Sequence, residues 1–185
     1  MISVTDLRKG VTFEMDGALF KVLDYQHHKP GRGNATIRTR LRNLRSGSTI
    51  DRTFQSGDRV QDVRLDRRIV QYLYNDGQFY HFMDTETFEQ PILGADILGD
   101  AAKYLVDGLN IELNLYDGEP IDVELPVTVD MRVAQTELAI KGDTATGATK
   151  DATTETGLVV KVPLFVAEGD TIRVDTRTGS YLTRV

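Results

Sequence analysis

The residues best suited to chemistry lie between positions 29 and 42, where basic side chains recur at short spacing. The first group is a turn-rich loop of six residues, Lys29, Pro30, Gly31, Arg32, Gly33 and Asn34. Its two glycines permit unusual backbone angles and add little bulk, while the proline limits the freedom of the loop. We therefore expect Arg32 to project alone from the tip. The alternative is a mobile surface hairpin with incidental charge.

The second group consists of Arg38, Arg40 and Arg42, which alternate with less polar residues. Residues two apart on a strand share a face of the sheet. The arginines should therefore stand on one side, with Ile37 and Leu41 facing the core. A guanidinium stays charged and can donate two hydrogen bonds to one phosphate group. This pattern predicts an RNA-facing basic surface, and a solvated barrel face is the alternative.

Other polar clusters do not fit catalysis or metal binding. His27 and His28 are adjacent, so on a strand they point to opposite faces, and the chain has only one further histidine, His81, and no cysteine. The carboxylates of residues 84–89 read as a solvated acidic stretch. Residues 142–147 lack the Gly-Lys-Ser/Thr ending of a phosphate-binding P-loop. We therefore expect no catalytic residue, no metal and no cofactor.

The net charge of −6 is unevenly distributed along the chain. Residues 1–65 carry 12 Lys and Arg against 7 Asp and Glu, residues 66–127 carry 3 against 13, and residues 128–185 carry 7 against 8. Salt screens charges over about 8–10 Å, so a distant acidic domain would not cancel a basic one. This asymmetry favours nucleic-acid contact at the first segment, although chance fluctuation is an alternative. The three segments are also our predicted domains.

Alternating apolar stretches separated by turn residues predict an all-β fold of small barrels. A hairpin is expected around Asp16 and Gly17, and a strand over 35–44 should carry the three arginines. The best helix candidate lies within 93–105, where apolar residues recur at helical spacing. Residues 141–156 are polar, and no strand is predicted there.

The termini and the apolar runs give no sign of export or membrane insertion. No apolar run approaches the roughly 18 residues needed to span a membrane. The start, MISVTDLRKG, lacks the long apolar core of a signal peptide. We expect a cytoplasmic protein without a membrane partner.

Several stretches together resemble the bacterial translation elongation factor P family. They are MISVTDLRKG at the start, KPGRGNA between two strands, RTFQSGDRV, FMDTETFEQ, and the long ending from KGDTATGATK to GSYLTRV. The resemblance covers essentially the whole chain. It implies three small β-barrels, an SH3-like (KOW-type) first domain and two OB-type domains, in an elongated, L-shaped arrangement like that of tRNA.

The resemblance also implies a function. Members of the family bind the 70S ribosome between the P and E sites, where the first-domain loop points to the acceptor end of P-site peptidyl-tRNA. The factor thereby relieves stalling at consecutive prolines. The ribosomal RNA performs the chemistry, so the factor is not an enzyme, and a monomer is expected. Arg32 matches the loop tip. Residues that match third-domain contacts to the small subunit and tRNA are Gly142, Asp143, Thr144, Gly147, Tyr181 and Arg184.

The loop tip departs from the pattern of many family members, which carry a lysine that is extended by β-lysylation. Arg32 cannot undergo that chemistry. Some members have a rhamnosylated arginine, but in loops without the Pro-Gly-Arg-Gly setting found here. Modification of Arg32 by an enzyme therefore stays open, and an unmodified arginine is favoured.

Three alternative functions remain at this point. The first is the elongation factor P-like paralogue, although the ending DTRTGSYLTRV favours the main factor. The second is a general binder of single-stranded RNA, which would need exposed aromatic side chains for base stacking. The chain has no tryptophan, and its other aromatic residues fall mostly within predicted strands. The third is an enzyme, but no group of residues in the sequence matches the pattern of a catalytic site.

Overall fold

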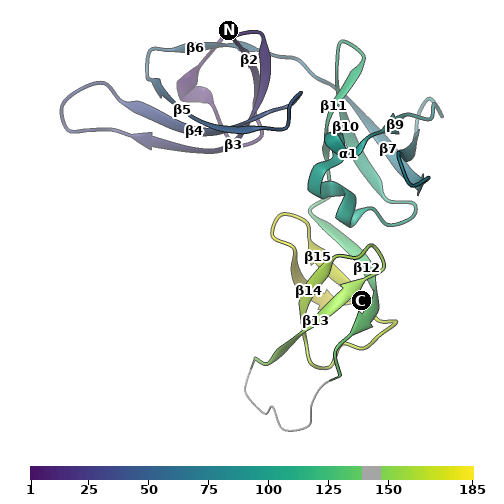
Figure 1. The fold of residues 1–185 in the computed structure, drawn as a ribbon. Helices are drawn as coiled ribbons and strands as arrows, with labels where there is room; N and C mark the ends of the chain where they lie inside the picture. Colours follow the sequence, from purple (N-terminus) through teal and green to yellow (C-terminus); the bar gives the residue numbers. More distant parts are fainter. Residues whose placement is uncertain (139–146) are drawn as a thin grey trace. The chain divides into compact units, whose positions relative to one another are not determined.

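The computed structural model describes residues 1–138 and 147–185, and β-strands dominate it (Figure 1). Three β-sheets account for most of the described chain, which confirms the predicted all-β class. The chain forms two compact units, residues 1–66 with 114–122, and residues 67–113 with 123–185. No helix among the described residues has the length and apolarity to cross a membrane.

The first unit is built on a six-stranded sheet of order β1-β6-β2-β3-β4-β5. Its strands are β1 Ile2–Ser3, β2 Thr12–Met15, β3 Ala18–His28, β4 Thr36–Asn43, β5 Thr49–Gln55 and β6 Arg59–Asp62. A short 3₁₀ helix, η1 (Val4–Asp6), follows β1. The core that these elements enclose includes Phe13, Ile37 and Leu41, all at most 1% exposed. Burial of these side chains fixes which face of β4 points outward.

The turn between β2 and β3 confirms the predicted hairpin. Asp16 and Gly17 both have positive φ angles, 53° and 75°, and Met15 pairs with Ala18 across them. Two consecutive positive φ angles give a turn whose twist matches that of paired strands. The tight turn therefore sets the register with which β3, the longest strand, enters the sheet.

A second sheet has the order β11-β10-β7-β8-β9. Its strands are β7 Asp66–Asn75, β8 Tyr80–Asp84, β9 Ile92–Leu93, β10 Asn110–Tyr116 and β11 Glu119–Glu124. Apolar side chains such as Val70, Phe82 and Ile111 are buried. Along β7, fully buried positions alternate with more exposed ones, as expected for a strand with one face in the core.

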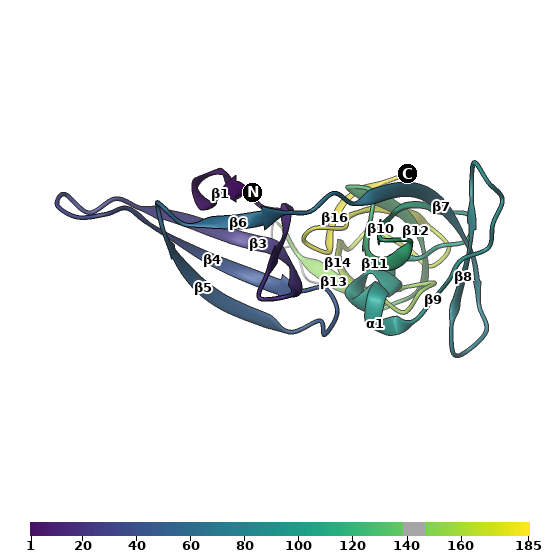
Figure 2. The same ribbon diagram turned by 90° about the horizontal axis from the view of Figure 1, so that it is seen from above.

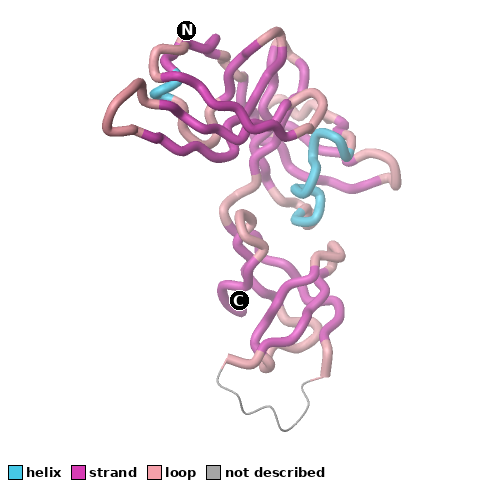
Figure 3. The backbone as a smooth tube through the Cα atoms, turned by 60° about the vertical axis from the view of Figure 1, so that its left-hand side comes forward, coloured by secondary structure: helices cyan, strands magenta, loops and turns pink. Residues whose placement is uncertain are grey.

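The predicted helix within 93–105 is present but broken. An α-helical turn, α1 (Ala95–Leu98), passes into a 3₁₀ helix, η2 (Gly99–Tyr104), and both appear in cyan in Figure 3. Gly99 has φ 52° and ψ −132°, which no α-helix accommodates. Glycine adopts this conformation at little steric cost, so it ends α1 after one turn.

The third sheet has the order β14-β13-β12-β15-β16 and contains one strand that the sequence did not predict. Its strands are β12 Thr128–Thr136, β13 Thr149–Thr154, β14 Val159–Pro163, β15 Thr171–Asp175 and β16 Ser180–Arg184. The missed strand is β13. Its buried positions are Lys150, Ala152 and Thr154, so polar side chains occupy much of its inward face. Hydropathy alone cannot reveal such a strand.

Candidate nucleic-acid interface

The basic loop connects the two longest paired strands of the first unit. Strands β3 and β4 pair from Phe20 with Asn43 up to His28 with Thr36, and the loop of residues 29–35 follows at the end of this ladder (Figure 2). The hairpin therefore carries the loop at its far end.

Arg32 stands at the centre of this loop. Every residue from 29 to 34 is exposed, and Gly33 has φ 116°. Within the part of the chain that the structure describes, Arg32 has no hydrogen-bond or ion-pair partner. Its guanidinium therefore keeps all of its donors for a ligand.

The stem beneath the loop is braced from both sides of β3 and β4. The Arg8 guanidinium lies 5.3 Å from the centre of the Tyr25 ring, and its Nη1 donates to the carbonyl oxygens of Thr5 and Leu7 at 2.9 and 2.7 Å. On β4, the buried Thr39 hydroxyl donates to the Arg52 carbonyl at 2.9 Å. These contacts tie the stem to the segment around η1 and to β5.

The alternation along β4 is as predicted. Ile37, Thr39 and Leu41 are buried, whereas Arg38 and Arg40 are exposed on the opposite face. Arg42, at the inner end of the strand, is partly buried. The three arginines therefore lie on the outward face of β4, as predicted, but Arg42 is less exposed than Arg38 and Arg40.

The three arginines also differ in their partners. Arg40 Nε lies 3.2 Å from Asp51 Oδ1, and both side chains are largely exposed, so this pair is open to solvent. Arg38 and Arg42 have no ion-pair partner among the described residues. Near Arg42, the Lys21 ammonium lies 2.6 Å from Asp122 Oδ2 in a largely buried pair. Arg38 is thus the exposed, unpaired cation of this face.

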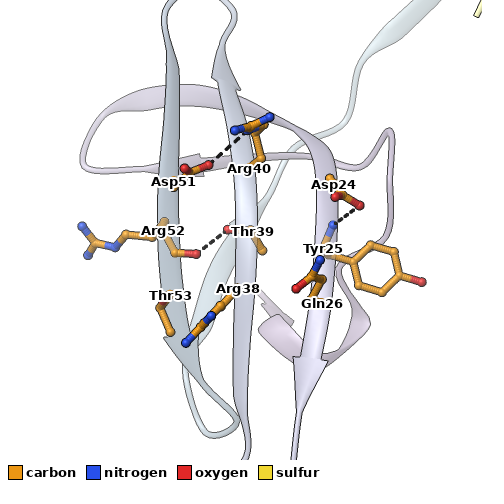
Figure 4. Close-up of a pocket in the computed structure, with 9 residues that line it drawn as sticks. All are labelled: Asp24, Tyr25, Gln26, Arg38, Thr39, Arg40, Asp51, Arg52 and Thr53. Carbon is orange, nitrogen blue, oxygen red and sulfur yellow. Dashed lines mark hydrogen bonds and ion pairs between the residues drawn. The ribbon is translucent and has the colours of Figure 1, made fainter. Parts of the chain in front are cut away.

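Six exposed side chains surround a hollow of about 370 Å³ on this face, which we call the sheet-face hollow (Figure 4). They are Asp24, Gln26, Arg38, Arg40, Asp51 and Thr53. The sequence did not single out Asp24 and Asp51. Each lies directly opposite Arg40, on β3 and β5 respectively, and only the strand register reveals this.

The predicted third-domain contacts are partly outside the described residues. Gly142, Asp143 and Thr144 lie there, while Gly147 is exposed at their border, with φ 90°. Tyr181 is partly buried and packs against the core of the third sheet.

Arg184 has two partners that the sequence did not indicate. Its guanidinium lies 5.1 Å from the centre of the exposed Phe165 ring, and its Nη1 is 3.5 Å from Asp170 Oδ2. The guanidinium is thus held against an aromatic ring at the surface, and it stays half-exposed.

The carboxylates with the most perturbed pKa values hold turns together. A hydrogen bond from His81 and two backbone N–H groups lower the pKa of Asp76 to about 2. Hydrogen bonds from the Arg177 side chain and backbone lower the pKa of Asp175 to about 2. The described residues contain no group of three or more His, Cys, Asp or Glu side chains placed to hold a metal ion.

Comparison with family models identifies three matching regions. A model described as "Elongation factor P (EF-P) KOW-like domain" matches residues 3–60, "Elongation factor P (EF-P) OB domain" matches 65–123, and "Elongation factor P, C-terminal" matches 129–184. These matches support the predicted KOW-type and OB-type folds.

Curated relatives match over their full length. Elongation factor P of Moorella thermoacetica is 53% identical over 184 residues, and that of Acetivibrio thermocellus is 51% identical over 185, with 100% of each chain covered. Among solved structures, the eukaryotic translation initiation factor 5A from Methanococcus jannaschii has a TM-score of 0.50 and 23% identity, covering 66% of this chain and 92% of that one. This last likeness concerns the fold alone.

Proposed function

The chain belongs to the elongation factor P family, a family of translation elongation factors, and we propose that it binds the 70S ribosome between the P and E sites. There it stimulates peptide-bond formation by positioning the P-site peptidyl-tRNA, and it relieves stalling at consecutive prolines. A factor that only orients the tRNA accelerates the reaction by lowering the entropic cost of reaching the reactive geometry.

The observation that carries this proposal is the isolated arginine at the end of a braced hairpin. Arg32 is exposed and without a partner among the described residues, while the stem below it is held by Arg8 and Thr39. A single exposed cation at the end of a long hairpin suits contact with the phosphates beside the acceptor end of tRNA.

The arginine face of β4 would meet the RNA backbone, with Arg38 as the exposed member that has no ion-pair partner among the described residues. The small subunit and the tRNA would be contacted by the third domain, through the loop around Gly142 to Gly147, Tyr181 and Arg184. The division into domains 1–65, 66–127 and 128–185, a monomeric state, a cytoplasmic location and an unmodified Arg32 are also parts of this proposal.

General single-strand binding fits the exposed aromatic residues less well. Tyr74, Phe79 and Phe88 are exposed, but they lie in the segment 66–127, which carries 13 acidic against 3 basic residues. Phe165, which is also exposed, already has the Arg184 guanidinium over its ring. Stacking platforms for RNA normally accompany a positively charged groove. The charge around these rings would therefore repel the RNA backbone.

The test is reconstituted translation of a template with three consecutive proline codons, with and without the unmodified recombinant protein. We expect clear stimulation of full-length product. The same template with alanine codons in place of proline is the control and should respond little. Equal yields with and without the protein on the proline template would contradict an active, unmodified Arg32. Intact-mass analysis of the native protein would then show whether a modification is missing.

A further inference from the structure

We propose that the sheet-face hollow binds one ribonucleotide of an RNA strand, with its phosphate on Arg38 and its ribose 2′-hydroxyl on Asp24. The inference deepens the proposed function and rests on it for the presence of RNA. It makes the hollow a site that distinguishes RNA from DNA, beyond the general attraction of a basic surface for phosphate.

The first observation is that cross-strand pairing sorts the hollow into two rows of opposite character. Gln26, Arg38 and Thr53 stand opposite one another on β3, β4 and β5, and all three can donate hydrogen bonds. Asp24, Arg40 and Asp51 form the next row, with a carboxylate on each side of the arginine. The rows are two residues apart along β4, or about 7 Å.

The donor row suits a phosphate group. Arg38 is exposed and has no ion-pair partner among the described residues, so its planar fork is available for two hydrogen bonds to phosphate oxygens. Gln26 and Thr53 add neutral donors on either side. Figure 4 shows Arg38 on the middle strand, β4, with its side chain beside Thr53 of β5.

The acidic row does not suit a second phosphate. Arg40 is already paired with Asp51 at 3.2 Å, and the two carboxylates leave the row with a net negative charge. A continuous track of phosphates along β4 is therefore interrupted after Arg38. The group that passes over this row must be one that donates hydrogen bonds.

Asp24 is the better acceptor of the two carboxylates. It is exposed, and the one hydrogen bond that its carboxylate accepts from the described residues is from the Tyr25 backbone N–H at 2.9 Å. The group nearest to a phosphate on an RNA strand that can donate to it is the ribose 2′-hydroxyl, which DNA lacks. A phosphate on Arg38 would place the adjoining ribose over the acidic row.

The experiment compares two labelled probes of the same sequence, a ten-nucleotide oligocytidylate as RNA and as DNA. Binding to the full-length protein is measured at low salt by fluorescence anisotropy, with nuclear magnetic resonance to locate the shifted amides. The variants are Arg38→Gln and Asp24→Ala, with Asp62→Ala as matched control. Asp62 is an exposed carboxylate on β6, outside the hollow.

We expect the wild type to bind RNA about tenfold more tightly than DNA, since a hydrogen bond to a charged group has about this effect. Asp24→Ala should bring the two affinities together, because the DNA gains from lost repulsion and the RNA loses its acceptor. Arg38→Gln should weaken both probes, and Asp62→Ala should keep the wild-type ratio.

Three results would overturn the proposal. They are equal binding of RNA and DNA by the wild type, an unchanged ratio in Asp24→Ala, and unchanged binding in Arg38→Gln. Because no ribosome is present, this outcome is separate from that of the translation assay. A protein inactive in translation could still prefer RNA, and an active protein could lack the preference.

Discussion

At the scale of single residues, the arginines of the first unit divide by their partners. Arg40 is paired with Asp51, and Arg45 lies 3.5 Å from Glu119, whereas Arg32 and Arg38 are exposed without ion-pair partners in the described part of the chain. An exposed ion pair adds little to the free energy of unfolding. It does, however, reduce the charge that the arginine presents to RNA. Function should therefore depend on Arg32 and Arg38 most strongly.

Arg32→Ala should abolish the stimulation of Pro-Pro synthesis without affecting the fold, because Arg32 is exposed and has no hydrogen-bond or ion-pair partner among the described residues. Translation yield and thermal unfolding would be measured together. Arg59→Ala, which removes an exposed arginine from β6, is the matched control and should remain active. Normal activity of Arg32→Ala would rule out the role of the tip.

Arg38→Gln should weaken ribosome binding more than Arg40→Gln does, and in a salt-dependent manner. Each phosphate contact that is lost should lower the slope of log K against log salt by about 0.7 to 0.9. Binding would be measured by filtration at several salt concentrations. Arg42→Gln should have an intermediate effect, since Arg42 is partly buried. A loss that does not vary with salt would indicate misfolding instead.

At the scale of elements, the β3–β4 hairpin and its loop act together, and one glycine sets the backbone path at the tip. Gly33 has φ 116°, a conformation that side chains with a Cβ rarely adopt. Gly31 lies outside that region, and apart from its two chain neighbours no residue has an atom within 4 Å of the position that its Cβ would take. The two glycines flank the same arginine but tolerate substitution differently.

Gly33→Ala should therefore reduce stimulation of Pro-Pro synthesis, whereas Gly31→Ala should remain near the wild type. Strained backbone of this kind costs about 1–3 kcal/mol, which an exposed loop relieves by changing its path. We expect the thermal midpoint to stay unchanged in both variants. Equal activities would show that the path of the loop does not matter.

Local patterns predicted much of this fold, and contacts between distant residues account for the rest. The Asp16-Gly17 hairpin and the outward face of β4 follow from turn chemistry and alternation within a few residues. The β13 strand was missed because it buries Lys150 and Thr154. Asp51 pairs with Arg40 only through the register of β4 and β5, and the sequence separation of 11 between them does not specify that register.

At the scale of the whole molecule, charge is divided between segments, and the two carboxylates with the lowest pKa values lie outside the basic one: Asp76 is in the acidic segment 66–127, and Asp175 is in the segment 128–185. The pKa of Asp76 and the pKa of Asp175 are both about 2, against an ordinary 3.8. A carboxyl group with a depressed pKa in the folded state stabilises the protein above its unfolded pKa. That contribution disappears as the pH falls through the folded value.

The free energy of unfolding should therefore be nearly constant from about pH 7 to pH 5 with respect to these two groups, and fall between about pH 4 and pH 2. Urea titrations at several pH values would measure it. Asp175→Asn removes one depressed group, so its decline over the acidic range should be shallower. An identical decline in this variant would assign the acid sensitivity to other carboxylates.

The placement of Arg32 also makes the hairpin a natural point of proteolysis. Exposed loop tips are preferred sites of nicking, and the Arg32–Gly33 bond lies in the middle of this one. Lys29 is followed by proline, which leaves Arg32 as the better site for a protease that cuts after basic residues. The eight cross-strand pairs between β3 and β4 would hold the two fragments together after the cut.

Limited digestion should thus yield a protein that runs as two fragments on a denaturing gel and as one particle in gel filtration. We expect the nicked particle to lose its stimulation of Pro-Pro synthesis, and bound ribosomes to protect the bond. One cleaved peptide bond would then remove the stimulation of Pro-Pro synthesis while the fold and every side chain are kept.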